Sequence, residues 1–553
     1  MNKLLLFAKK YPVEIVLVIF ALSFSFWLMF HTFSYNDGQM LITGKAWSDF
    51  ASHVPLVRSF SFGDNFPPEF PLFPGPPIRY HFLFYLLVGY LEKIGLRIDY
   101  ALNIPSALSF AALVIVIYFF AKTLFKSRAV GVLSVVFFLL NGSLSFLEFF
   151  KDHPLSTNTI QDITANTTFP SFAPYGKSIV SAFWNLNIYT NQRHLALPLA
   201  LLFAIVLFII KFEKRQKHIP IYSLVVIGIL IGILPFSHSS VFIMALSVLG
   251  ILLLLLPKLR KSIFLILLIG GLLSLPRILF LKETATFIPT INLNYLVPNL
   301  SILSFLYYWL MNLGLFFFLI PIGVLISPLI GKKVFFAFLS LFFIGHTIQF
   351  SPEIAANHKF FNAFLILGNM FAAYLLARLW NWHILSKLLV SILIFLMTLS
   401  GIIDFFPIKN DSKIALADYP KNQDVAWIIK NTEKNSIFLN STYLYHPASL
   451  AGRKIFLGWP YFPWSAGYDT LTRDNLRKSL LNSTNLDLFC KESKKNNINY
   501  VELNISEKYG FPINYSFFDK NIDKVYKSTI SDLSIYDINK SCNPREKPFR
   551  QSG

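Results

Sequence analysis

Long apolar runs alternate with short polar segments through the first 406 residues of the chain. Runs such as residues 14–33, 104–120 and 263–281 hold very few charged side chains. Each approaches the ~20 apolar residues that an α-helix needs to cross the hydrocarbon core of a bilayer. This pattern predicts a polytopic α-helical membrane protein. Its first run is too long, and lacks the small-residue cleavage site, for a removable signal peptide, so we expect it to remain as an anchor.

The apolar runs divide into about eleven predicted spans, each bounded by polar or turn-forming residues. The composition supports this division: 54% of the residues are hydrophobic and the mean hydropathy is +0.55, whereas soluble domains rarely exceed about half apolar residues. The predicted spans are residues 14–33, 103–122, 129–147, 194–211, 219–236, 238–256, 262–281, 303–328, 334–350, 360–377 and 385–405.

The net charge of +20 reflects basic residues that gather between the predicted spans. The positive-inside rule places such clusters on the cytoplasmic side. The N-terminus is then cytoplasmic, the C-terminal tail is extracytoplasmic, and 12 of the 14 Asp and Glu residues before residue 407 fall at the outer face. No RNA- or DNA-binding motif accompanies the charge, so we expect no nucleic-acid partner. The six clusters are Lys3/Lys9/Lys10, Lys122/Lys126/Arg128, Lys211/Lys214/Arg215/Lys217, Lys258/Arg260/Lys261, Lys332/Lys333 and Arg378/Lys387.

Residues 81–97 form a further apolar run that does not fit this scheme. If they crossed the membrane, every later loop would change sides and five basic clusters would face outward, against the positive-inside rule. We therefore predict a helix that lies in, or dips into, the outer interface. The large outer loops are then residues 34–102, 148–193, 282–302 and 351–359, and we expect function where these loops converge.

The apolar runs end near Pro407, and residues 407–553 predict an extracytoplasmic α/β domain, separate from the transmembrane domain of residues 1–406. At ~140 residues this domain is large enough for a core of its own. Helical spacing predicts helices at residues 422–432, 471–481 and 486–495. Alternation predicts strands at residues 436–439 and 498–503 and a final hairpin at residues 525–528 and 533–538.

Two features of the predicted C-terminal domain have two interpretations each. Arg453-Lys454 with the aromatic segment 459–464 is either a buried loop beside a solvated charge pair or a lid that faces the membrane site. Cys490 and Cys542 are the two cysteines of the chain. They either pair outside the cytoplasm or remain free thiols.

Candidate chemistry begins in the first outer loop, where carboxylates gather at one membrane face. A carboxylate in lipid is costly, so such a cluster suggests chemistry or ion handling. Asp49 and His53 are four residues apart and would share one face of a helix. Asp49 could then serve as a general base or as a ligand of a divalent cation. Asp37 competes for the role of base, although Asn-Asp-Gly also predicts a turn.

The other outer loops supply candidates for substrate binding. Asp152 follows the third predicted span, and Arg193 and His194 open the fourth. Arg193 suits a phosphate because its planar guanidinium donates two parallel hydrogen bonds. His358 and Lys359 precede the tenth span. There Lys359 could bind a phosphate or extend to the lipid headgroups.

The sequence contains no Walker A, HExxH, GxSxG or paired CxxC motif. Nothing in the sequence therefore indicates ATP hydrolysis or a zinc site. Any energy for a reaction would have to arrive already stored in a substrate.

The order of these features resembles the GT-C superfamily of glycosyltransferases, which includes oligosaccharyltransferase catalytic subunits, protein O-mannosyltransferases and lipid A aminoarabinose transferases. Residues 10–200 carry the resemblance: a first span, an acid in the first outer loop, an interfacial helix, two spans joined by a basic loop, and acids opening a second outer loop. Asn36-Asp37-Gly38 with Gly44 is similar to the first-loop acid segment of bacterial oligosaccharyltransferases. The segment from Asp49 to His53 is more similar to uncharacterised bacterial members.

The resemblance implies a polyprenyl-phosphate-linked sugar donor and an inverting transfer at the outer face of the cytoplasmic membrane, onto a glycan, lipid or protein acceptor. It implies that Asp49 or Asp37 deprotonates the acceptor and that Arg193 or Lys359 binds the phosphate. Asp152 would orient the acceptor or share a metal. Some GT-C enzymes need a divalent cation and others do not, so the resemblance leaves open Mg²⁺ or Mn²⁺. Neither the Trp-Trp-Asp signature of oligosaccharyltransferases nor the Asp-Glu pair of O-mannosyltransferases occurs.

A transporter or flippase of a lipid-linked or envelope precursor is the alternative, and a non-catalytic scaffold for envelope assembly is another. A transporter favours inverted repeats and charges at mid-bilayer. No clear repeat is visible, and the acids gather at one face. His238 and His346 would be the polar residues nearest to a transport pathway, and otherwise they are hydrogen-bonded histidines at helix ends.

Overall fold

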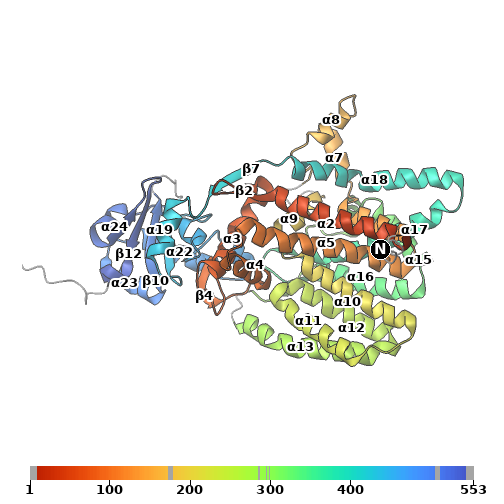
Figure 1. Cartoon of the computed structure of the whole chain (residues 1–553), viewed down its shortest axis with the longest axis horizontal. Helices are drawn as coiled ribbons and strands as arrows, with labels where there is room; N and C mark the ends of the chain where they lie inside the picture. Colours follow the sequence, from red (N-terminus) through yellow and green to blue (C-terminus); the bar gives the residue numbers. More distant parts are fainter. Residues whose placement is uncertain are drawn as a thin grey trace, which may run out of the picture.

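The structure is a computed structural model of the whole chain and describes residues 9–171, 179–283, 287–293, 295–297, 299–504 and 511–542. A bundle of apolar helices forms one end, an α/β unit forms the other, and the first outer loop lies between them (Figure 1). The described residues contain seven helices long and apolar enough to span a membrane, or eight if one bent pair is a span. The protein is therefore a polytopic helical membrane protein. The seven are α2 (Pro12–Thr32), α5 (Ile98–Phe125), α10 (Ala196–Arg215), α13 (Arg260–Glu283), α16 (Leu329–Thr347), α17 (His358–Trp380) and α18 (Ile384–Lys409).

Three of the four remaining predicted spans fall on single shorter helices. These are α6 (Arg128–Leu139), α11 (Ile221–Ser237) and α12 (Ser239–Leu255). With 12 residues, α6 is about 18 Å long, against a hydrocarbon core of ~30 Å. The predicted span 129–147 ends early, at Leu139, and the chain then turns before α7 (Ser145–Asp152). The number of eleven spans stays a prediction.

The predicted span at residues 303–328 is broken in the structure. Two helices occupy it, α14 (Ile302–Leu313) and α15 (Phe316–Ile326), and the pair is bent by 90°. Gly314 lies at the bend with a positive φ of 57°. A Cβ there would come within 2.1 Å of the Gly142 carbonyl oxygen, so only glycine fits this turn. A hydropathy pattern does not reveal such a bend.

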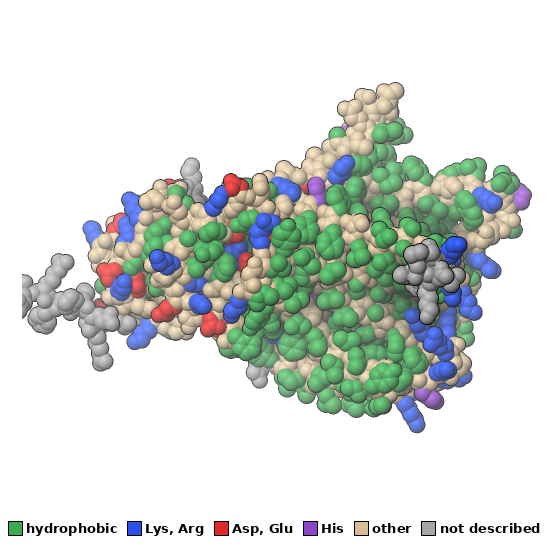
Figure 2. Space-filling model, viewed as in Figure 1, with side chains coloured by type: hydrophobic (Ala, Val, Ile, Leu, Met, Phe, Trp, Pro, Cys, Tyr) green, Lys and Arg blue, Asp and Glu red, His purple; other side chains and the backbone are tan. Residues whose placement is uncertain are grey.

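Several basic loops meet at the end of the bundle that lies away from the α/β unit. Lys214 Nζ donates to the Thr123 carbonyl at 2.6 Å, and Lys258 Nζ donates to the side chain of Gln216. Figure 2 shows Lys and Arg side chains gathered at this end. The arrangement agrees with a common side for the basic clusters, and the identity of that side stays a prediction.

The first outer loop forms a small layer on top of the bundle. Its hairpin, β1 (Phe33–Asn36) and β2 (Gln39–Thr43), pairs antiparallel with β7 (Lys413–Ala417) after the last helix of the bundle. The predicted interfacial helix is α4 (Leu83–Lys93), whose 11 residues give about 16 Å, too short to cross. Between them lie η1 (Gly44–Ala46), α3 (Trp47–Ser61), β3 (Glu69–Phe70) and β4 (Phe73–Pro77).

The C-terminal part contains the predicted helices and strands, arranged as a five-stranded sheet of order β11-β12-β10-β8-β9. Strand β10 runs parallel to β8 and antiparallel to β12. Helix α18 continues through Pro407 to Lys409, slightly beyond the predicted boundary. The elements are β8 (Ile437–Asn440), β9 (Lys454–Ile455), β10 (Ile498–Asn504), β11 (Asp523–Lys527), β12 (Leu533–Asp537), α19 (Gln423–Asn431), α20 (Pro447–Leu450), α21 (Tyr461–Ser465), α22 (Thr470–Leu481), α23 (Leu486–Lys495), α24 (Tyr515–Asn521) and α25 (Ile538–Cys542).

The sheet buries its two faces differently. Leu439 and Val501 pack with Phe489 in a core of the C-terminal unit alone. Phe438 and Val425 instead belong to a hydrophobic cluster that includes residues of the first outer loop. Part of the core of the α/β unit is therefore supplied by the first outer loop, which fixes the unit over that loop.

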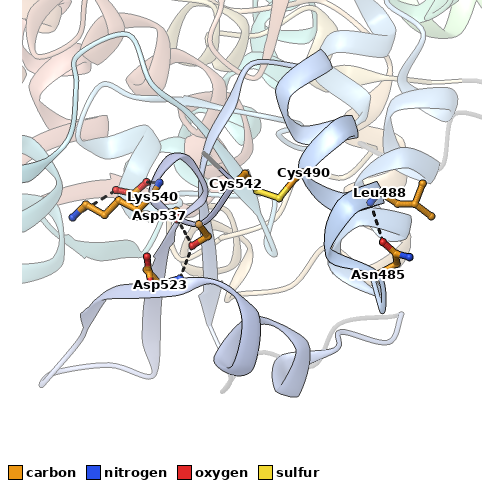
Figure 3. The surroundings of a disulfide bond; sticks show 8 residues. Asn485, Leu488, Cys490, Asp523, Asp537, Lys540 and Cys542 are labelled. Carbon is orange, nitrogen blue, oxygen red and sulfur yellow. Dashed lines mark hydrogen bonds and ion pairs between the residues drawn. A yellow bond between two sulfur atoms is a disulfide. The ribbon is translucent and has the colours of Figure 1, made fainter. Parts of the chain in front are cut away.

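Cys490 on α23 and Cys542 on α25 form a disulfide, with their Cα atoms 5.5 Å apart (Figure 3). Of the two interpretations open from the sequence, the structure contains the pairing. Structural disulfides are typical of compartments outside the cytoplasm. The bond therefore agrees with the predicted extracytoplasmic position of this domain.

Candidate functional site

A cavity of about 420 Å³ lies where three outer loops and the α/β unit meet. Side chains from α3, the segment before α4, the second outer loop, the start of α17 and α21 line it. The polar and aromatic members are Ser48, Asp49, Ser52, Phe70, Tyr80, His81, Phe183, Asn187, Asn191, Gln192, Glu353, His358, Lys359, Trp459, Tyr461, Phe462 and Ser465. Three of the four predicted outer loops, residues 34–102, 148–193 and 351–359, line this cavity, whereas no described residue of the fourth, 282–302, is among its lining.

Asp49 reaches the cavity from the first turn of α3, as the helical pattern predicted. Burial raises the pKa of its carboxyl to about 6, while the positive charge of Lys359 and the side-chain amide of Asn191 act in the opposite direction. Asn191 also donates to the Lys45 carbonyl at 3.0 Å, which holds its amide beside α3. A carboxylate with a pKa near neutrality in a cavity has the properties of a general base.

Lys359 enters the cavity from the first turn of α17. The short helix η4 (Ile354–Asn357) precedes it, and Asn357 donates to the carbonyls of Gly345 (2.9 Å) and Ile348 (2.8 Å), which ties this turn to the end of α16. A cation at a helix N-terminus is disfavoured by the helix dipole, whereas an anion there is favoured. In the part of the chain that the structure describes, Lys359 makes no hydrogen bond or ion pair, so its charge is available to an anionic ligand.

An aromatic segment of the C-terminal unit covers the cavity. Trp459, Tyr461 and Phe462 line it, and Tyr461 donates to Glu353 Oε2 at 3.1 Å. Ser351 Oγ donates to the Ser465 carbonyl at 2.6 Å, which joins α21 to the chain just before η4. The aromatic segment 459–464 therefore has the position expected of a lid that faces the membrane site.

The basic pair before this segment is structural and not solvated. Arg453 is buried and donates to the carbonyls of Phe62 and Thr432. Lys454 forms an ion pair with Glu69 at 2.7 Å. Both charges therefore bind the α/β unit to its surroundings.

Three of the predicted site residues other than the histidines lie away from the cavity. Asp37 forms the β1–β2 turn with φ of 46°, is exposed, and pairs with Lys421. Asp152 is exposed at the end of α7, in the arm of α7 and α8 (Thr159–Thr164) that projects from the bundle (Figure 1). Arg193 is buried, and its guanidinium donates to Thr190 O, Asn103 Oδ1 and Thr32 Oγ1. These bonds occupy the donors that were predicted to bind phosphate, and Arg193 instead joins three segments of the bundle.

The three predicted histidines have different surroundings. His358 lines the cavity and stacks on Phe183, with ring centroids 4.7 Å apart. His53 follows Asp49 by one turn but is buried below it, against Tyr85. Burial and the charge of Arg193 lower the pKa of His53 to about 3, so it is neutral and not a proton donor to Asp49. His194 is also buried and contacts His81.

Sequence reasoning did not assign roles to Asn191, Tyr80 and His81, which line the cavity. Nothing in the local pattern distinguishes Asn191 from other loop amides. Tyr80 and His81 end the proline-rich part of the first outer loop. Their position at that boundary was the one sequence feature that could have marked Tyr80 and His81 as candidate site residues.

Comparison of the structure with solved structures shows the fold. Two structures of arabinofuranosyltransferase AftD from Mycobacteria match at TM-scores of 0.57 and 0.54, with 11% sequence identity. The match covers 94% of this chain but only 41% and 40% of those chains. The apo form of the Archaeoglobus fulgidus oligosaccharyltransferase matches at a TM-score of 0.51 and 10% identity, over 97% of this chain and 75% of that chain.

Comparison of the sequence adds no closer relative. No protein-family model matches the chain, and no curated protein matches it. The chain therefore shares its fold with these solved structures, in agreement with the predicted resemblance of residues 10–200 to GT-C glycosyltransferases.

Proposed function

From the GT-C fold of this chain, we propose that it is a glycosyltransferase that moves a sugar from a polyprenyl-phosphate-linked donor to an acceptor at the extracytoplasmic face of the membrane. One observation carries this proposal. The half-buried carboxylate of Asp49 and the unpaired ammonium of Lys359 line the same cavity, between the membrane helices and the aromatic segment of the α/β unit. A base and a phosphate-binding cation in one cavity are the two groups that the transfer needs.

The proposed reaction is a single displacement with inversion at the anomeric carbon. Asp49 accepts the proton of the acceptor hydroxyl or amine as that atom forms its bond to the anomeric carbon. The bond between the anomeric carbon and the phosphate oxygen breaks, and the electron pair leaves with the polyprenyl phosphate. Lys359 stabilises the negative charge that develops on this oxygen.

The described residues that line the cavity do not form a site suited to Mg²⁺ or Mn²⁺. Such hard cations take several oxygen ligands, and the acids that line the cavity are Asp49 and Glu353. The carboxylate of Glu353 already accepts hydrogen bonds from the Ala355 N–H and from Tyr461. Asp152, the acid predicted to share a metal, lies on the projecting arm. No step of the proposed reaction uses such a cation.

The position of the charged groups also supports a transferase over a transporter. Asp49 and Lys359 lie at the end of the helices, under a lid from the α/β unit, and not along the middle of the bundle. His346, one of the two histidines nearest to a hypothetical pathway, accepts a hydrogen bond from Trp309 at 2.7 Å. It is thus a helix-end histidine with a structural partner.

The proposal is tested with the full-length protein in vesicles that contain radiolabelled polyprenyl-phosphate sugars and candidate acceptors. We expect acceptor-dependent release of unlabelled polyprenyl phosphate, and Lys359→Met should lower kcat/KM about 10²-fold or more, because one donor to the leaving charge is lost. Lys434→Met, an exposed lysine outside the cavity, is the matched control. Movement of the intact donor across the bilayer without sugar release would favour the transporter instead.

The pH dependence of transfer should follow the ionisation of Asp49. Its pKa is raised to about 6, so a larger fraction of the base is protonated, and inactive, as the pH falls through this value. We expect log(kcat/KM) to rise with pH and level off above about 6. Because Lys359 lowers the pKa of Asp49, the residual activity of Lys359→Met should level off at a higher pH. A profile that is flat from pH 5 to 8 in both proteins would contradict the role of Asp49.

A further inference from the structure

Three histidines from distant parts of the chain converge beneath the cavity. His81 precedes α4, His194 precedes α10, and His238 lies between α11 and α12. Within the described residues they are the one group of three or more His, Cys, Asp or Glu side chains placed to hold a metal, and their ligand atoms all lie within 4.8 Å of one another. No short zinc-binding motif in the sequence could predict this group, because the three histidines belong to three separate loops.

Packing around the group holds the three loops together. The Phe82 N–H donates to the Phe236 carbonyl at 3.1 Å, which joins the segment of His81 to that of His238. Arg277 from α13 donates to the carbonyls of Ile78 (2.6 Å) and Tyr80 (3.1 Å), just before His81. These hydrogen bonds to backbone carbonyls hold the segments that carry His81 and His238 next to each other.

His238 is the histidine of the three whose buried ring nitrogens lack partners that a ligand would supply. It is only 1% exposed, yet neither of its ring nitrogens has a hydrogen-bond partner among the described residues. Each buried polar atom left without a partner is unfavourable. His346, the comparable helix-end histidine, differs because Trp309 donates to its Nε2.

His194 has the outer contact that a metal-binding histidine needs. Its Nδ1 lies 2.6 Å from the Tyr85 hydroxyl, and its Nε2 faces His81 Nε2 at 2.5 Å. A partner on one ring nitrogen fixes the ring and leaves the other nitrogen for the metal. Nitrogen atoms around a tetrahedral zinc are about 3.3 Å apart, since Zn–N bonds are about 2.0–2.1 Å. The separations here, from 2.5 Å to less than 4.8 Å, bracket that value.

We propose that His81, His194 and His238 bind one divalent transition-metal ion of the zinc class. Three neutral imidazoles suit Zn²⁺ and its neighbours and do not suit Mg²⁺ or Ca²⁺. Three protein ligands leave a fourth position open, as in catalytic zinc sites. His81 also lines the cavity, so the fourth ligand is a water or an oxygen of a molecule bound in the cavity. The metal site stands on its own observations and does not depend on the glycosyltransferase proposal.

The test measures metal content in the full-length protein, purified in detergent without a histidine tag. The protein is stripped with a chelator, incubated with Zn²⁺, desalted and analysed by plasma mass spectrometry. We expect about one zinc per chain in the wild type, as for a single three-histidine site, and its loss in His238→Ala and His81→Ala. His346→Ala, a buried histidine outside the group, should retain the zinc.

Cobalt provides a second measurement that reports on geometry. Co²⁺ added to the stripped wild type should give the intense visible absorption of a tetrahedral site, and His81→Ala should lack it. His81 is only half-buried, so this variant keeps the proposal testable if His238→Ala fails to fold. A wild-type protein that retains no zinc, or an equal zinc content in wild type, His238→Ala and His81→Ala, would overturn the proposal.

Discussion

Asp49→Asn is expected to abolish nearly all sugar transfer while the protein remains folded in the membrane. The asparagine keeps the size of the side chain and its contact with Asn191 but cannot accept a proton. General bases contribute about 10²–10⁴-fold to a rate, so kcat should fall by that factor. Binding of the donor, measured with a radiolabelled lipid-linked sugar, should change much less, because the phosphate is assigned to Lys359.

Two other acids of the first outer loop make this experiment decisive. Asp64→Asn is the matched control, since Asp64 is exposed and outside the cavity. Asp37→Asn tests the competing base directly. Asp37 lies in the β1–β2 turn against Lys421, so we expect its substitution to leave transfer near the wild-type rate. Loss of transfer in Asp37→Asn with normal transfer in Asp49→Asn would reverse the assignment.

Arg58→Met is expected to detach the α/β unit from the first outer loop. Arg58 is 1% exposed on α3 and pairs with Glu92 of α4 at 3.1 Å and with Asp418, just after β7, at 2.7 Å. The methionine preserves volume but leaves two buried carboxylates without a cation. Breaking a buried ion pair in this way costs about 3–5 kcal/mol.

Limited proteolysis measures this effect. The segment around residues 410–422 joins the bundle to the α/β unit, and it should be cleaved much faster in Arg58→Met than in the wild type. Arg97→Met is the control, because Arg97 pairs with Asp99 but its side chain is 47% exposed, and exposed pairs contribute about 0–1 kcal/mol. Combined replacement of Arg58, Glu92 and Asp418 by apolar residues should restore resistance, since no buried charge then remains. Equal cleavage rates in all variants would show that the triad does not hold the unit in place.

The candidate site divides between what a local pattern could predict and what it could not. Both Asp49 and Lys359 lie in the cavity. Asp49 was predicted because it lies in the acid-rich first outer loop, one helical turn before His53. Lys359 was predicted because it is a charged residue at the edge of an apolar run. Arg193 has the same sequence signature, but its guanidinium is occupied by Thr190, Asn103 and Thr32. A one-dimensional pattern contains no information on those partners, so it could not separate a ligand-binding cation from a structural one.

The apolar helices, the positions of the basic loops between them, and most helices and strands of the C-terminal unit could be predicted from local sequence patterns. These features follow from the period and length of apolar runs, which depend on residues close together in the chain. The three-dimensional packing was needed to show that Asp49 and Lys359 line one cavity, that Gly314 bends a predicted span, and that His81, His194 and His238 meet. These contacts depend on which loops the packing of the bundle brings together. Residues close together in the chain do not specify that packing.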